Sequence, residues 1–212
     1  MTIDVASHLG AVRRSVQALE RDGQPARAVI LERSYATDID DLWNALTSPE
    51  RLPRWFLPVE GELKLGGRYQ LKGNAGGTIT DCDAPVHLGL TWEMMGQVSW
   101  VEVRLAREAE GRTRFTLTHT APLSDFWRQY GPGAVGVGWE GGLMGLALYL
   151  ADPAGMKLDE ATFAASPEGK RFYAGSSERW GEAAIAAGED ADMIAAAVRA
   201  TTAFYTGEPP VS

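Results

Sequence analysis

The stretch GPGAVGVGWEGGLMGLALYL (residues 131–150) decides between two kinds of fold. Its first six residues have the glycine spacing of a dinucleotide-binding fingerprint. Such a fingerprint follows a parallel strand inside a strand–helix–strand unit. This stretch instead follows APLSDFWRQY (residues 121–130), and the pattern after it predicts no parallel strand. The glycines therefore indicate helix packing rather than phosphate binding.

The same residues predict one long helix. Its apolar stripe at helical spacing consists of Trp139, Leu143, Leu146 and Leu150. An interior glycine costs about 1 kcal/mol relative to alanine, so a helix with several glycines must be stabilised by packing. Small faces allow close approach to a sheet or to another chain, and they also leave room for a ligand beside the helix.

The residues before this helix alternate with the period of two that is typical of strands. Apolar side chains share one face in HLGLTWEM (residues 87–94), SWVEVRLAR (residues 99–107) and RTRFTLTHT (residues 112–120). GELKLGGRYQL (residues 61–71) indicates two further strands joined by a glycine pair, and TITDCDAP (residues 78–85) indicates another. Together they predict an antiparallel sheet covered on one face.

The first third of the chain predicts a strand between helices. RAVILERSY (residues 27–35) is rich in β-branched and aromatic residues, as strands are. Thr37 can cap a short helix after it, and Ser48 begins a second brief helix. Apolar residues at helical spacing predict an amphipathic helix over residues 4–21.

Two more helices are expected in the last quarter of the chain. Ser166 begins a helix that carries Trp180 and ends at Gly188. Asp190 begins a second helix, which ends at Gly207. These alanine-rich helices need an apolar surface to cover, either on their own domain or on a second copy of the chain.

The composition excludes several classes of function. The 212 residues carry a net charge of −8 and a pI near 4.9, so neither nucleic acid nor a membrane is expected as a partner. Cys82 is the single cysteine and the 3 histidines are scattered, so no disulfide, metal or other cofactor is expected. No signal peptide and no segment of membrane-spanning length is identified, which predicts a cytoplasmic protein.

The motifs, taken in order, resemble the Activator of Hsp90 ATPase homologue 1-like family of the START-like (SRPBCC) superfamily. They are RSYATDIDDLWNALTSPERLPRWF (residues 33–56), TITDCDAPVHLGLTWE (residues 78–93), FTLTHTAP (residues 115–122) and the helix with Gly138-Trp139. The resemblance implies an α+β helix-grip (START/Bet v 1-like) fold. In that fold a curved antiparallel sheet wraps around the long helix.

The resemblance also implies a division of the chain into three parts. Residues 27–151 form the START-like domain, residues 1–26 hold the N-terminal amphipathic helix, and residues 152–212 form a C-terminal helical extension. The extension resembles that of a bacterial subgroup of the family. Because the terminal helices need a partner surface, a homodimer is one alternative and closure on their own domain is the other.

Superfamily members bind lipids, hormones or aromatic polyketides in an apolar cavity between sheet and helix, and the resemblance implies such a cavity here. A pocket of this kind needs large apolar faces with few polar groups. The candidate lining residues are Trp55, Phe56, Tyr69, Trp92, Phe115, Leu117, His119, Trp139, Leu143 and Leu146. Trp55 and Phe56 lie at the edge of a loop, where cavity mouth, oligomer interface and core all remain open.

His119 is the polar candidate, because strand alternation places it on the same face as Phe115 and Leu117. It can hydrogen-bond a ligand or act as a general acid or base near neutral pH. The structural alternative is a hydrogen-bonded histidine at a strand end, since the sequence identifies no partner acid.

The leading hypothesis is a non-catalytic binding protein for a small hydrophobic or aromatic molecule. One alternative is a cyclase- or dehydratase-like enzyme in which His119 is the acid or base. A second alternative is a protein-interaction module, including the co-chaperone role in the stress response that the family name suggests.

Overall fold

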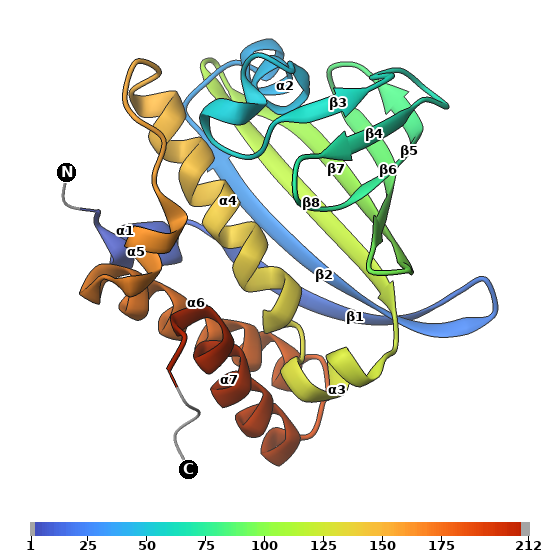
Figure 1. Cartoon of the computed structure of the whole chain (residues 1–212), viewed down its shortest axis with the longest axis vertical. Helices are drawn as coiled ribbons and strands as arrows, with labels where there is room; N and C mark the ends of the chain where they lie inside the picture. The colour runs from blue at the N-terminus through green and yellow to red at the C-terminus, as the bar shows by residue number, and fades with distance from the viewer. Residues whose placement is uncertain (1–2, 209–212) are drawn as a thin grey trace. The chain divides into compact units, whose positions relative to one another are not determined.

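The computed structural model describes residues 3–208 and shows an α+β fold (Figure 1). An 8-stranded sheet has the order β1-β2-β8-β7-β6-β5-β4-β3. Its strands are β1 (Arg13–Arg21), β2 (Gln24–Tyr35), β3 (Val59–Gly61), β4 (Arg68–Leu71), β5 (Gly76–Asp83), β6 (His87–Met94), β7 (Gln97–Ala109) and β8 (Arg112–Pro122). The helices are α1 (Val5–Gly10), α2 (Ile39–Thr47), the 3₁₀ turn η1 (Leu52–Arg54), α3 (Asp125–Tyr130), α4 (Gly133–Ala151), α5 (Glu160–Ala165), α6 (Pro167–Ala186) and α7 (Ala191–Thr206).

The chain forms two compact units, and β2 and α4 run through both. The helical unit consists of the chain up to Leu31, Pro122–Met144 and the chain from Leu158 onward. The sheet unit consists of Glu32–Ala121 and Gly145–Lys157. The three-part division with boundaries after residues 26 and 151 stays a prediction.

From β3 through β8, each strand pairs antiparallel with the next strand along the chain. The turn Met95-Gly96, with φ of 53° and 76°, closes the β6–β7 hairpin, and positive φ at both positions is typical of a type I′ turn. The alternation predicted for β8 is confirmed, since Phe115, Leu117 and His119 are all buried. The face that carries these three side chains is called the inner face below.

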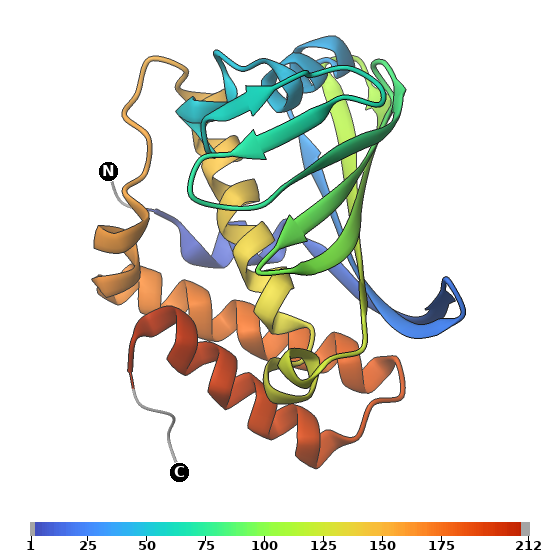
Figure 2. The same ribbon diagram turned by 45° about the vertical axis from the view of Figure 1, so that its right-hand side comes forward.

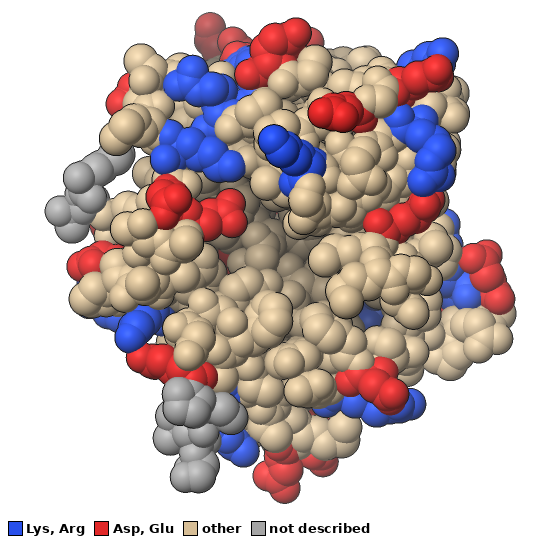
Figure 3. Space-filling model, in the orientation of Figure 1, with Lys and Arg blue, Asp and Glu red and all other residues tan. Residues whose placement is uncertain are grey.

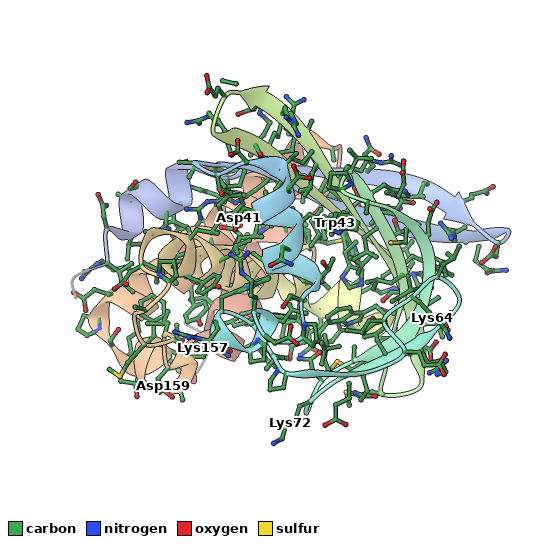
Figure 4. All side chains as sticks on the ribbon, turned by 90° about the horizontal axis from the view of Figure 1, so that it is seen from above. Asp41, Trp43, Lys64, Lys72, Lys157 and Asp159 are labelled. Atoms are coloured by element: carbon green, nitrogen blue, oxygen red, sulfur yellow. The ribbon has the colours of Figure 1, made fainter. Side chains whose placement is uncertain are left out.

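Helix α2 begins after Asp38 rather than at the expected cap Thr37. The Thr37 hydroxyl instead donates a hydrogen bond to the Asp41 carboxylate over 2.7 Å. Asp41 and Trp43 leave α2 on opposite sides (Figure 4). Asp41 also accepts a hydrogen bond from Arg51 over 2.8 Å, which fastens α2 to the segment before η1.

The second brief helix expected from Ser48 is reduced to the single turn η1. The Ser48 hydroxyl does accept hydrogen bonds from the amides of Glu50 and Arg51, as a helix cap does. Pro53 contributes no amide hydrogen, and the chain leaves helical geometry at Trp55, where φ is −137°. The sequence signal therefore marked the capping residue correctly and overestimated the helix.

The helix expected over residues 4–21 is wrong beyond its first turns. Only α1 is helical, and residues 13–21 form β1. Asp22 and Gly23 have φ of 52° and 73°, which makes a hairpin turn that pairs β1 with β2. Val16 of the predicted apolar stripe is buried. The spacing of the apolar residues therefore predicted which side chain is buried, but it predicted a helix where the chain forms a strand. Pairing with a neighbouring strand overrides the local helical pattern.

Two long C-terminal helices confirm the predicted starts. Helix α6 follows Ser166, whose hydroxyl accepts from the Gly169 amide over 3.0 Å, and α7 follows Asp190, whose carboxylate accepts from the Met193 amide over 3.0 Å. Helix α7 ends at Gly207 as predicted. Helices α6 and α7 lie side by side, and α3 packs against α7 (Figures 1 and 2). The short helices α3 and α5 have no counterpart among the helices predicted from the sequence.

A buried ion pair between Arg14 and Glu140, which was not predicted from the sequence, lies inside the helical unit. Arg14 donates from Nε and Nη2 to the two carboxylate oxygens of Glu140, and both distances are 2.6 Å. The two side chains are only 6% and 1% exposed. Arg14 also donates to the carbonyl oxygens of Val12 and Leu9. The interior charges are thus paired and hydrogen-bonded, and the pair links β1 to α4.

Close packing explains two of the α4 glycines, as predicted. A Cβ at Gly136 would lie 2.2 Å from Cε2 of the fully buried Trp180 on α6. A Cβ at Gly138 would lie 2.8 Å from the hydroxyl oxygen of Tyr205 on α7. In contrast, a Cβ at Gly141 would meet no atom within 4 Å. Glycine is therefore required sterically at residue 136, avoids a close contact with the Tyr205 hydroxyl at residue 138, and is not required at residue 141.

Helix α4 corrects the expectation that no segment reaches membrane-spanning length. Among the described helices it is long and apolar enough to cross a membrane, with 19 residues and a mean hydropathy of 1.3 over its apolar window. Core helices of soluble proteins meet the same criteria, and 33% of this window is buried. The helix also carries the ion-paired Glu140.

Candidate functional site

The register of β6, β7 and β8 places inner-face residues of neighbouring strands directly opposite each other. Residues directly opposite each other in an antiparallel pair point to the same face. One row runs Leu88, Val103, Leu117, and the next runs Leu90, Val101, His119. These two rows of the inner face are therefore apolar except for the imidazole of His119.

A buried cluster of Tyr69, Leu71 and Ile79 lies at the β4–β5 end of this surface. Hydrophobic side chains that are only partly buried pack around it: Phe56, Leu57, Val59, Leu88, Leu90 and Trp92. The Tyr69 hydroxyl donates to the carbonyl oxygen of Thr91 over 2.7 Å, and burial raises the pKa of this phenol. The hydrogen bond to Thr91 fixes the Tyr69 side chain in this cluster. The partly buried residues around the cluster keep part of their apolar surface accessible to solvent.

Trp55 and Phe56 stack at the edge of the inner face, with ring centroids 5.4 Å apart. Trp55 is buried, and its indole Nε1 donates to the Ala45 carbonyl over 2.9 Å, which secures it to α2. A Cβ at Gly145 would approach the Trp55 carbonyl oxygen to 2.9 Å, so the end of α4 packs closely on this segment. Trp55 is therefore core, whereas Phe56 belongs to the partly buried group.

His119 is buried and bonded to Ser99 across the inner face, since Nε2 lies 2.8 Å from the Ser99 hydroxyl oxygen. The Ser99 hydroxyl oxygen also lies 3.1 Å from the Trp92 carbonyl oxygen, so Ser99 links the imidazole to the backbone of β6. The Trp92 ring centroid lies 6.0 Å from that of His119. Burial lowers the pKa of His119 from 6.5 to about 4, so the imidazole is neutral at pH 7.

This lowered pKa predicts a pH-dependent stability. The unfolded chain binds a proton on His119 below pH 6.5, and the folded chain does so only below about 4. The free energy of unfolding should therefore fall by about 3 kcal/mol through this residue as the pH drops from 7 to 4. Urea unfolding of wild type and His119→Gln at several pH values measures the difference. Parallel pH profiles for the two proteins would contradict the assignment.

The remaining predicted residues divide between the two units. Phe115 and Leu117 are buried on the inner face, and the Phe115 ring meets that of Tyr35 edge-on with centroids 6.2 Å apart. Leu146 is fully buried in the sheet unit. Trp139 and Leu143 lie in the helical unit, so the ten residues are not shown to form one site. Their common role as ligand contacts stays a prediction.

Sequence reasoning misses Ser99 as the partner of His119. Ser99 lies directly opposite Trp92 in the β6–β7 hairpin, and Val101 lies directly opposite His119. The hairpin turn at Met95-Gly96 sets this register, so recognition of that turn would have placed Ser99 on the inner face. Leu88 and Leu90 share the alternation of Trp92 and could have been named with it.

Comparison with known proteins identifies the family of this chain. Residues 36–151, more than half of the chain, match the family described as Activator of Hsp90 ATPase homolog 1-like protein. No curated protein matches the chain.

Solved structures extend the similarity beyond these residues. CalU16 from Micromonospora echinospora is 30% identical, and its crystal structure matches over 84% of this chain and 99% of CalU16 with a TM-score of 0.65. Its solution NMR structure matches over 84% and 97% of the two chains with a TM-score of 0.70. EF2215 from Enterococcus faecalis, at 18% identity, covers 88% and 96% with a TM-score of 0.62 and shares the fold. These matches and the strand order confirm the α+β helix-grip class, and the chain belongs to the Activator of Hsp90 ATPase homologue 1-like family.

Proposed function

We propose that the protein binds a small, largely apolar molecule on the inner face of the sheet unit. The observation that carries the proposal is the ring of partly buried hydrophobic side chains around Tyr69, Leu71 and Ile79. Burying apolar surface stabilises a complex by about 25 cal/mol per Å². Phe56, Leu90 and Trp92 still have such surface to bury, which a ligand with an apolar or aromatic body can cover.

Few polar groups on this face limit what the ligand can be. His119 and Ser99 hydrogen-bond to each other, and Tyr69 donates to the Thr91 carbonyl. A buried polar atom of a ligand without a partner would cost about 1–3 kcal/mol. The ligand on this surface is therefore mostly hydrocarbon or aromatic ring.

Binding can be tested with the neutral fluorophore N-phenyl-1-naphthylamine. Leu90→Trp should fill part of the surface and weaken binding at least about tenfold, whereas the volume-conserving Leu90→Met should bind nearly as wild type does. Fluorescence titration measures both dissociation constants, and thermal melts check that the variants are folded. An equal affinity of wild type and Leu90→Trp would contradict this placement, and no binding by wild type would contradict the function.

Native mass spectrometry of freshly purified protein adds a test with the natural ligand. An added mass that disappears on denaturation gives the size of the bound molecule, and the main peak gives the oligomeric state. A dimer would favour the homodimer alternative, and a monomer would favour closure of the terminal helices on their own domain. We also propose that the protein acts in the cytoplasm.

The enzymatic alternative rests on His119. A neutral imidazole can accept a proton, and the Ser99 hydroxyl beside it orients the ring. A cyclase- or dehydratase-like activity predicts that His119→Ala keeps ligand affinity and loses turnover. The protein-interaction alternative, including a co-chaperone role, would instead require specific capture of a chaperone by the intact chain.

A further inference from the structure

The segment beside Trp55 and Phe56 carries two cations whose partners are backbone carbonyl groups. Arg54 donates to the carbonyl oxygens of Pro153 and Gly155 over 2.9 and 3.1 Å. Lys157 Nζ donates to the carbonyl oxygen of Phe56. Lys and Arg side chains gather on this part of the surface, where the end of α4 and the chain after it lie (Figure 3). The contacts hold both cations at one edge of the sheet unit.

Among the described residues, neither Arg54 nor Lys157 forms an ion pair with a carboxylate. The carboxylates around them accept hydrogen bonds from other groups: Asp41 pairs with Arg51, Asp152 accepts from the amide of Gly155, and Asp159 accepts from the amide of Thr162. A carbonyl group carries no formal charge, so Arg54 and Lys157 keep theirs. A guanidinium has five N–H donors and an ammonium three, so both cations retain donors for another acceptor. The whole chain has a net charge of −8, which makes this local positive charge unusual.

A hydrogen bond and a packing contact connect this positive edge to the apolar surface. Lys157 is bonded to the carbonyl of Phe56, and the Phe56 side chain packs on the cluster of Tyr69, Leu71 and Ile79. A molecule whose apolar body covers Phe56 therefore has its end within reach of an ammonium group. Charge-assisted hydrogen bonds are about twice as strong as neutral ones, so an anionic group there would add affinity and set the orientation of the ligand.

We propose that the ligand is an amphipathic anion, whose carboxylate, sulfonate or phosphate is recognised by Arg54 and Lys157 while its apolar body covers the inner face around Phe56. The inference rests on the proposed function. It narrows the ligand from an apolar molecule to one that carries a negative charge at one end.

Two probes with the same rings test the charge separately from the apolar body. 8-Anilinonaphthalene-1-sulfonate is N-phenyl-1-naphthylamine with one added sulfonate. Wild type should bind the sulfonate probe about tenfold more tightly than the neutral probe. Arg54→Gln and Lys157→Gln should each remove much of this preference and leave the neutral affinity unchanged. Glutamine at residue 157 removes the charge and keeps an N–H donor for the Phe56 carbonyl.

Lys64→Gln is the matched control, because Lys64 is an exposed lysine of the same unit that lies away from Lys157 (Figure 4). It should leave both affinities at the wild-type values. Equal binding of the two probes, unaffected by Arg54→Gln and Lys157→Gln, would overturn the anion inference and leave the proposed function intact. An equal loss in Lys64→Gln would also overturn it, since that result indicates general attraction to positive charge. Binding of neither probe would overturn the proposed function itself.

Discussion

Replacing Glu140 with Gln is expected to lower the free energy of unfolding by about 3–5 kcal/mol. The substitution leaves the Arg14 guanidinium 6% exposed and without the carboxylate that now accepts two of its hydrogen bonds. An unpaired interior charge is far more costly than a pair, and the Leu9 and Val12 carbonyls that remain carry only partial charge. Urea unfolding at pH 7 measures the loss.

The double variant Arg14→Met/Glu140→Leu separates charge pairing from packing. Because paired interior charges contribute little net stability, the double variant should recover most of the stability that Glu140→Gln loses. The exposed ion pair of Arg171 and Glu168 provides the comparison, and Glu168→Gln should change stability by less than about 1 kcal/mol. A double variant as unstable as Glu140→Gln would show that shape, rather than charge, is what the site requires.

Gly136→Ala is expected to destabilise the protein by about 3 kcal/mol, and Gly141→Ala to stabilise it by up to about 1 kcal/mol. The new methyl at residue 136 would lie 2.2 Å from the rigid indole of Trp180, which is fully buried. The methyl at residue 141 meets no atom within 4 Å. The two substitutions are chemically identical and both lie in α4, so helix propensity alone predicts the same sign for both.

Thermal and urea unfolding of the two variants measure this difference directly. Trp180→Phe in the Gly136→Ala background removes the part of the indole that the methyl meets, and it should restore part of the lost stability. Stabilisation by both alanines would mean that α4 does not pack on α6 as closely as described.

The alternating segments were sufficient to predict strands β4 to β8. The strand expected at the start of residues 61–71 is wrong, because β3 spans only Val59–Gly61 and residues 62–67 form no strand. Side chains of Phe115, Leu117 and His119 point to one face in any regular strand, so no distant contact is needed to predict it. The caps at Ser166 and Asp190 are equally local, because a side-chain oxygen three residues before an amide can satisfy it without help from elsewhere. The family resemblance then supplied the order in which such strands and helices assemble.

The candidate site could be predicted only in part. Strand alternation places Trp92 and His119 on one face, but the partner of His119 depends on the hairpin register that brings Ser99 opposite Trp92. Trp55 and Phe56 look equivalent in sequence. The contact with Ala45 buries one of them, while the other stays partly accessible.

Local periodicity and capping chemistry thus determined strand β2, strands β4 to β8, the long helix and the C-terminal helices from the sequence by itself. Tertiary structure decided that residues 13–21 are a strand, that Arg14 is an interior cation paired with Glu140, and that Gly136 faces Trp180. Each of these depends on residues more than 40 positions apart or on pairing with a neighbouring strand. The pattern of apolar residues along the chain indicates which side chains of a segment are buried. Which other segments bury them depends on contacts between residues far apart in sequence, so it is decided only by the tertiary structure.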